Sequence, residues 1–210
     1  MGPQPSGYSI PITVKGIDDA MVDPATAYQV SVSANSTQPY FNGVTIPNIQ
    51  LTNNDNDVPG VTIDRIVGLT TTEGGGTDTF RVVLNTQPSA PVTMNLSSSN
   101  PLEGTVSPAT LTFATTAGGP NGWNFPHVVT LTGVDDTALD FTVGYTITTG
   151  PLSSSDLNYN GINPPDVSAS NLDDEAIPAL PSVWGGGCGL LGLEAALLLG
   201  LARLGRRARR

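Results

Sequence analysis

The sequence predicts an all-β protein made of antiparallel β-sandwich units, one complete and one partial. Gly, Pro, Ser, Thr and Asn are abundant, charged residues make up 12% of the chain, and helix-forming residues are scarce before the last 25 positions. Short alternations of apolar and polar residues, separated by turn residues, run through residues 8–175. The same order of alternations occurs twice, which indicates an internal repeat.

The repeat rests on residues of the same type at a nearly constant spacing. At an offset of 117 and then, after one inserted residue, of 118, the first copy matches the second in these pairs: Asp18 and Asp135, Asp19 and Asp136, Asp23 and Asp140, Tyr28 and Tyr145, Gly43 and Gly161, Pro47 and Pro165, Asn53 and Asn171, Asp55 and Asp173. A repeat of this length corresponds to one domain. We therefore divide the chain into a partial unit (1–57), a complete unit (58–175), a linker (176–184) and a C-terminal segment (185–210).

The partial unit contains three alternations, around residues 10–14, 28–32 and 49–51. By the repeat, they correspond to the last three strands of a complete unit. Three strands with one apolar face are near the limit of independent stability. We expect this segment to be ordered mainly by contact with the next domain, or to be loosely ordered.

The complete unit contains seven candidate strands, at 61–67, 79–84, 91–97, 105–113, 127–134, 141–149 and 166–171. Seven short strands with turn signals between them and no helical period favour an antiparallel sandwich. The residues expected on the inner faces are Phe80, Val82, Leu84, Val92, Met94, Leu96, Phe141, Val143, Tyr145 and Ile147. In the glycine-rich loop 114–126, Trp123 and Phe125 are expected to cap the core rather than to bind a sugar.

Composition also limits the chemistry. Residues 1–184 carry three basic against 17 acidic residues, a net charge of −14, so nucleic acid is not an expected partner. With His127 as the single histidine and Cys188 as the single cysteine, the chain cannot form an internal disulfide or a Cys/His metal cluster, and we do not expect a histidine-based triad. Paired carboxylates exist, but they fall in predicted turns where they are solvated. We therefore predict a protein that is not an enzyme.

Acidic residues gather at the strand ends that a seven-strand sandwich places at one pole. They are Glu73, Asp135, Asp136, Asp140, Asp173, Asp174 and Glu175. Asp and Asn are also ordinary turn residues, which is the alternative interpretation of each cluster alone. Seven carboxylates at one pole would repel one another without a counter-ion, and Ca²⁺ takes six to eight oxygen ligands. We predict calcium ligands at Glu73, Asp135, Asp136, Asp140, Asp173 and Asp174.

A second set of candidate calcium ligands lies in the partial unit, at Asp18, Asp19, Asp23, Asp55 and Asp57. These residues should lie at the end of the partial unit that faces the complete one. The loop around Asp156 should come from the facing end of the complete unit. Calcium at this junction would stiffen the link between the units.

The stretches TTEGGGTDTFRVVL, GTVSPATLTF and HVVTLTGVDDTALD, followed by the acidic exit at 173–175, resemble Calx-β-type repeats. The resemblance covers 58–175 fully and 8–57 in part. It implies an immunoglobulin-like sandwich of the kind found in bacterial surface proteins and sodium–calcium exchangers, several of which bind calcium at one end. The family usually has an Asp before an aromatic residue between its third and fourth strands. Here the loop is SSSNPLEG, in which Glu103 is the one acidic residue that could replace it.

The C-terminal segment predicts a membrane helix. Residues 185–202 are interrupted by one charged residue, Glu194, and five arginines follow, which should stay on the cytoplasmic side. The glycines Gly186 and Gly187 with Cys188, the single helix and the basic end resemble C-terminal sorting tags of bacterial envelope proteins. That resemblance implies cutting or modification at this motif by a sorting protease or transferase. A plain tail anchor is the alternative.

The N-terminus lacks the basic and apolar regions of a secretion signal, so we expect the chain to be the C-terminal piece of a longer exported protein. The expected function is a calcium-stabilised adhesion or stalk module at the bacterial cell surface, close to the membrane. Its partner would be a cell-surface or matrix ligand. The alternative is a ligand- or carbohydrate-binding module that accompanies a surface enzyme.

Overall fold

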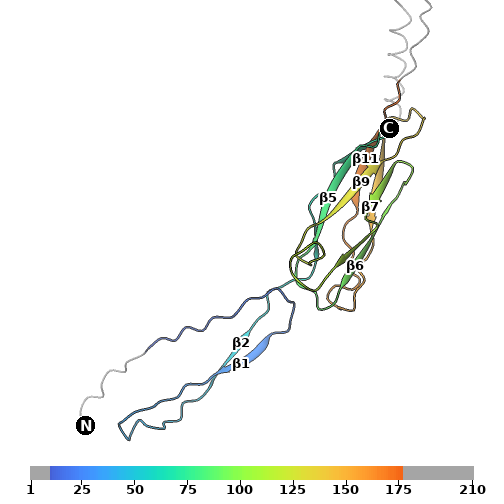
Figure 1. The fold of residues 1–210 in the computed structure, drawn as a ribbon. Helices are drawn as coiled ribbons and strands as arrows, with labels where there is room; N and C mark the ends of the chain where they lie inside the picture. The colour runs from blue at the N-terminus through green and yellow to red at the C-terminus, as the bar shows by residue number, and fades with distance from the viewer. Residues whose placement is uncertain (1–9, 177–210) are drawn as a thin grey trace, which may run out of the picture. The chain divides into compact units, whose positions relative to one another are not determined.

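A computed structural model describes residues 10–176, and within them the chain forms eleven strands and no helix (Figure 1). The all-β prediction is therefore confirmed for this part of the chain. None of the residues described forms a helix able to span a membrane. The predicted membrane helix, with Gly186, Gly187 and Cys188, lies outside the described residues.

Residues 61–172 form two facing sheets. The first has the order β3 (Val61–Ile63), β5 (Thr77–Leu84), β9 (His127–Gly133), β7 (Gly104–Ser107). The second has the order β4 (Leu69–Thr72), β11 (Val167–Leu172), β10 (Thr142–Thr149), β6 (Val92–Ser98), β8 (Thr110–Phe113). All neighbours are antiparallel except β4 and β11. This arrangement is an immunoglobulin-like β-sandwich.

The hydrophobic core lies between the sheets and is formed by alternate residues of each strand. Its buried apolar residues all fall between Leu69 and Ala169, so the sandwich contains a complete core of its own. Eight of the ten predicted inner residues are buried, and Trp123 joins them, while Phe125 is 43% exposed. Phe141 is a correction: it is 64% exposed, because it precedes β10 in a left-handed backbone conformation (φ 66°) that takes it out of the strand alternation.

Two predicted strands are each divided in two by local backbone chemistry. The stretch 61–67 ends as a strand at Ile63, and after Gly68, which has a positive φ of 76°, the chain enters β4 in the other sheet. The stretch 105–113 is divided at Pro108 into β7 and β8, which belong to different sheets. Proline has no N–H for the ladder, so the pairing changes there.

Residues before the sandwich form one hairpin, β1 (Thr26–Val30) with β2 (Ile49–Asn53). Its register matches that of β10 with β11: Tyr28 faces Leu51 as Tyr145 faces Ala169, the positions that the repeat makes equivalent. The alternation at 10–14 is not a strand, which corrects the prediction, and Ile10 is exposed. The equivalent strand β9 pairs with β5 and β7, and the partial unit contains no counterpart of either.

Before β1, between Asp19 and Asp23, the chain contacts the sandwich. The Gln87 N–H donates to the Ala20 carbonyl at 2.6 Å, and Ala20 packs against the edge of the core. The loop that follows Gln87 is tied to Asp156, whose carboxylate accepts the Ser89 N–H at 2.7 Å. Asp156 is buried, and the backbone N–H groups of Ser89 and Asn158 hold its pKa below the ordinary value even though burial opposes this.

Candidate metal centre

Eight carboxylates meet at the end of the sandwich where β11 finishes. We call this group the acidic pole; its members are Glu73, Glu103, Asp135, Asp136, Asp140, Asp173, Asp174 and Glu175. Glu73 follows β4, Glu103 precedes β7, and the others follow β9 and β11. Because β4, β9 and β11 end here and β7 begins here, the topology brings together segments that lie far apart in the sequence.

Carboxylate oxygens of the pole lie close enough together to hold a metal ion. Three sets of these residues each bring their carboxylate oxygens within 4.8 Å of one another. The sets are Glu73, Asp135, Asp174 and Glu175; Glu73, Asp140 and Asp173; and Glu103, Asp136 and Asp140. Glu73 and Asp140 each belong to two sets. Ca²⁺ binds oxygens at 2.3–2.6 Å, so opposite ligands of one ion stand about 5 Å apart. Each set therefore fits around one ion.

Glu73 is the most unusual residue of the pole. Its side chain is 1% exposed, yet neither carboxylate oxygen has a hydrogen-bond partner. One oxygen of Asp173 and one of Glu175 are also buried without a partner. By contrast, Asp136 accepts the Ala138 N–H at 2.6 Å, as a turn carboxylate does. A buried carboxylate without a partner is costly unless a cation lies against it.

The electrostatics of the pole follow from this crowding. Burial raises the pKa of Glu73, the neighbouring Glu175 carboxyl partly opposes this, and the negative charges of Asp173, Asp136 and Asp140 raise the pKa further. The pKa of Glu175 is raised from 4.5 to about 7, first because its protonated form hydrogen-bonds Asp173, then through burial and the nearby Glu73. The pole therefore binds positive charge, either protons or a metal ion, more readily than separate carboxylates do.

A buried polar residue, Asn171 on β11, holds the loops of the pole in place. Its Nδ2 donates to the Val134 carbonyl at 3.1 Å, directly before Asp135, and to Glu103 Oε2 at 3.5 Å. Its Oδ1 accepts the Thr71 hydroxyl at 2.9 Å. Residue 133 must be glycine for this approach, since a Cβ there would collide with Asn171 and with the Thr72 carbonyl.

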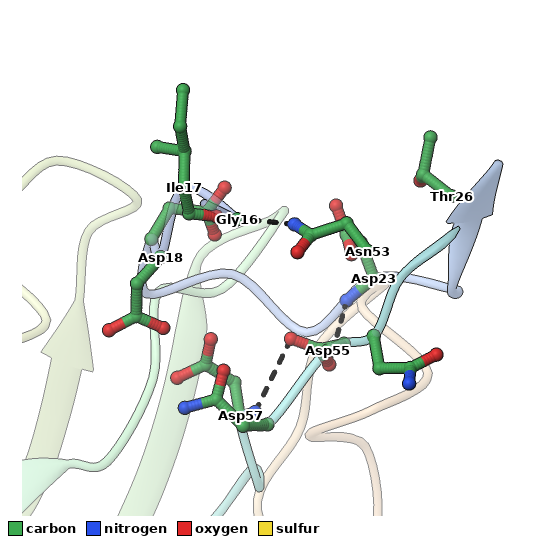
Figure 2. A pocket seen from close by; sticks show the side chains of 11 residues that line it. Gly16, Ile17, Asp18, Asp23, Thr26, Asn53, Asp55 and Asp57 are labelled. Atoms are coloured by element: carbon green, nitrogen blue, oxygen red, sulfur yellow. Dashed lines mark hydrogen bonds between the residues drawn. The ribbon is translucent and has the colours of Figure 1, made fainter. Parts of the chain in front are cut away.

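The hairpin segment contains the same construction. Asn53, the equivalent of Asn171, donates to the Ile17 carbonyl at 3.2 Å, directly before Asp18, and a Cβ at Gly16 would collide with Asn53. All five predicted aspartates of this segment line one pocket of about 190 Å³, which we call the hairpin pocket. Figure 2 shows the Asp55 carboxylate there, accepting the N–H groups of Asp23 and Asp57 at 3.3 Å each.

The hairpin pocket is nevertheless less complete than the acidic pole. Within residues 10–176, sets of three or more converging carboxylates occur at the pole and not in this pocket. Glu73 and Glu103 have no counterpart here, because they flank strands that the partial unit lacks. Burial raises the pKa of Asp57, and the charges of Asp55, Asp18 and Asp19 add to this, so the aspartates are close enough to repel one another.

The structure thus brings together every predicted ligand of the complete unit, and separately every predicted ligand of the partial unit. Sequence reasoning left Glu175 and Glu103 out of the predicted ligand set, although Glu103 was noted as the acidic residue of its loop. It also missed Asn171 and Gly133 as supports. The repeat could have identified both supporting residues, since TGVDD matches KGIDD and Asn53 matches Asn171 at the same offsets.

No family model matches the chain, and no curated protein matches it. Among solved structures, the apo-form Calx CBD1 domain is 15% identical, with 57% of this chain and 100% of that chain covered and a TM-score of 0.43. The periplasmic chaperone SfaE is 11% identical, with 57% and 61% covered and a TM-score of 0.40. Domains 4 and 5 of the S-layer protein SbsC are 20% identical, with 60% and 58% covered and a TM-score of 0.33.

Proposed function

We propose that residues 58–175 form a non-catalytic structural module that is stabilised by calcium at the acidic pole. The observation that carries the proposal is Glu73, buried among further carboxylates with both oxygens unpartnered. An ion at this position would supply the missing partner. It would also offset the repulsion among the four chain segments that converge there.

The ligand chemistry favours Ca²⁺ over other divalent ions. All candidate ligand atoms are carboxylate oxygens, whereas Zn²⁺ prefers nitrogen and sulfur ligands. Mg²⁺ usually keeps several waters and binds through one or two carboxylates, whereas a site made of many carboxylates suits Ca²⁺ better. The hairpin pocket contains aspartates equivalent to those of the acidic pole but has no counterpart of Glu73 or Glu103. We propose that it binds an ion at the junction of the units more weakly than the acidic pole does.

A structural role fits the remaining chemistry better than catalysis or sugar binding. His127 is buried at the opposite end of β9 from the pole, with its ring 4.4 Å from that of Phe113, and burial lowers its pKa. It therefore cannot work with the carboxylates as an acid–base pair. In the sandwich, the exposed aromatic residues Phe125 and Phe141 lie in separate loops rather than in a row on one sheet.

We place this module at the bacterial cell surface, as the membrane-proximal end of an adhesin or stalk. The support is the sequence order of an acidic sandwich, a short linker, an apolar stretch and an arginine-rich end. Processing at Gly186, Gly187 and Cys188 by a sorting protease or transferase belongs to the same proposal. A cell-surface or matrix ligand is the partner that such a module would present.

Differential scanning calorimetry of residues 58–176 in millimolar calcium and in chelator tests the function. We expect calcium to raise the melting temperature, and the double variant Asp136→Ala, Asp173→Ala to lose the rise while its apo form stays folded. Magnesium at the same concentration is the control and should have a much smaller effect. An unchanged melting temperature in the parent domain would make these residues ordinary turn carboxylates.

A further inference from the structure

Large apolar side chains stand exposed around the acidic pole. Leu102 is 73% exposed, Leu139 37%, Phe141 64% and Leu172 39%. Each is next in sequence to a carboxylate of the pole: Glu103, Asp140 or Asp173. Because oxygens of those carboxylates converge, the apolar residues lie at one end of the sandwich, Leu172 as the last residue of β11 and the other three on loops. We call Leu102, Leu139 and Phe141 the apolar rim.

Phe141 is notable within this rim. It is the one non-glycine residue with a positive φ among residues 10–176, and bulky side chains disfavour that conformation. Neither the core nor a neighbouring strand requires an aromatic residue here, since the side chain is mostly in solvent. Exposed Leu and Phe on adjacent loops are expensive in water and suit an interface that is partly apolar.

We propose that the acidic pole, once loaded with calcium, docks on an anionic phospholipid surface, with the apolar rim entering the headgroup region. The proposal rests on the calcium binding proposed above. Each carboxylate set contains three or four residues, whereas Ca²⁺ takes six to eight oxygens. Where these carboxylates bind through one oxygen each, coordination positions remain for lipid phosphate oxygens, and Leu and Phe side chains contribute by burial at the interface.

Charge makes this docking conditional on calcium. Without the ion, the pole presents up to eight negative charges and is repelled by anionic headgroups. Each bound Ca²⁺ offsets two of these charges, so the repulsion falls, and the metal can bridge protein and phosphate oxygens. The acidic pole would therefore bind the membrane only when calcium is present, and would not be a permanent anchor.

The order of the chain favours a membrane as the occupant. The apolar stretch 185–202 follows Glu175 after a nine-residue linker. Fully extended, such a linker spans at most about 35 Å. A membrane segment at 185–202 would therefore keep the acidic pole close to the bilayer, which raises the effective concentration of lipid at the pole.

The test uses residues 58–176, which contain the complete core and lack the apolar stretch that would bind vesicles by itself. Co-sedimentation is measured with vesicles of phosphatidylcholine containing phosphatidylglycerol, and with phosphatidylcholine alone. We expect sedimentation with the anionic vesicles in calcium, and none in chelator or with neutral vesicles.

The decisive variant is Leu102→Ser with Phe141→Asn, since Asn tolerates the positive φ of position 141. It should keep the full calcium-induced rise in melting temperature and lose at least tenfold in vesicle affinity. Val128→Ser is the matched control, because Val128 is 51% exposed but lies on β9, outside the rim, and should bind vesicles as the parent does.

The outcomes separate the two proposals. No calcium-induced rise in the parent overturns the proposed function, and docking with it. A normal rise without vesicle binding, or equal binding by the rim variant, overturns docking alone. Sedimentation velocity without lipid tests whether a second copy of the chain binds this surface instead. If the parent dimerises in calcium and the rim variant does not, the surface binds a second copy and the lipid proposal is overturned.

Discussion

Replacing Glu73 by Gln should change the stability of the sandwich in opposite directions with and without calcium. Gln has nearly the same volume as Glu, so the change removes a charge without leaving a cavity. Without metal, the buried Glu73 oxygens have no partner and face the charges of Asp173, Asp136 and Asp140. We therefore expect a higher melting temperature for the apo variant. With calcium, the variant lacks a charged ligand in two of the three carboxylate sets.

The magnitude follows from linkage. Calcium at a hundredfold excess over Kd stabilises the folded state by about 2.7 kcal/mol. Unfolding about 118 residues at about 2.1 cal/mol/K each gives an entropy near 0.25 kcal/mol/K, so the parent should gain about 10 °C. If the substitution raises Kd about a hundredfold, the same calcium concentration contributes only about 0.4 kcal/mol, or less than about 2 °C.

Calorimetry of the parent and of Glu73→Gln in chelator and in calcium measures both effects. Asp64→Asn is the matched control, because Asp64 lies beside β5 and accepts the Arg81 N–H at 2.7 Å, away from the pole. It should keep the full calcium increment. A variant at position 73 that melts below the parent in chelator, or that keeps the increment of about 10 °C, would refute the assignment of Glu73 as a strained ligand.

Three further predictions follow from the same residues. The folded state raises the pKa of Glu175 from 4.5 to about 7, so the folded domain binds this proton more tightly than the unfolded chain does. In chelator, the stability of the domain to urea should therefore fall as the pH rises from 4.5 to about 7. Calcium should make this decrease smaller. A gain in stability over that window in chelator would contradict this. Asn171→Ala should cost about 2–4 kcal/mol in urea unfolding and weaken calcium binding, since it leaves the Val134 carbonyl and the Thr71 hydroxyl without this partner; a loss of stability with unchanged calcium affinity would limit Asn171 to a structural role. Intact-mass analysis of the mature surface protein should show cleavage or modification at Cys188, and an unmodified Arg210 terminus would exclude it.

The sequence was most informative where a pattern is repeated or periodic. Alternation located the strands because inner and outer faces differ in polarity, and the repeat connected Asp18 to Asp135 and Asn53 to Asn171 before any coordinates were considered. The predicted ligands come together because the sandwich topology alone determines which loops share an end. These inferences required the order of the strands and no detail of side-chain packing.

The parts that sequence did not predict depend on contacts between distant residues. Whether 105–113 is one strand or two depends on which sheet each half joins, and Pro108 indicates only that the pairing is interrupted. Phe141 reads as a strand residue by alternation, but the loop that carries Asp140 imposes a left-handed backbone. The role of Asn171 depends on Thr71 and Val134, residues 100 and 37 positions away.

The two copies of the repeat differ in how many carboxylates they bring together. Both contain the glycine, the Asp pair, the supporting Asn and the acidic exit, and both arrange them in the same way. The complete copy alone adds Glu73 and Glu103, which flank strands β4 and β7 that the partial unit lacks, and the carboxylates converge there. Since an ion would bind residues contributed by both halves of the sandwich, metal binding and completion of the fold should be coupled. A hairpin half alone should bind weakly, however many aspartates it contains.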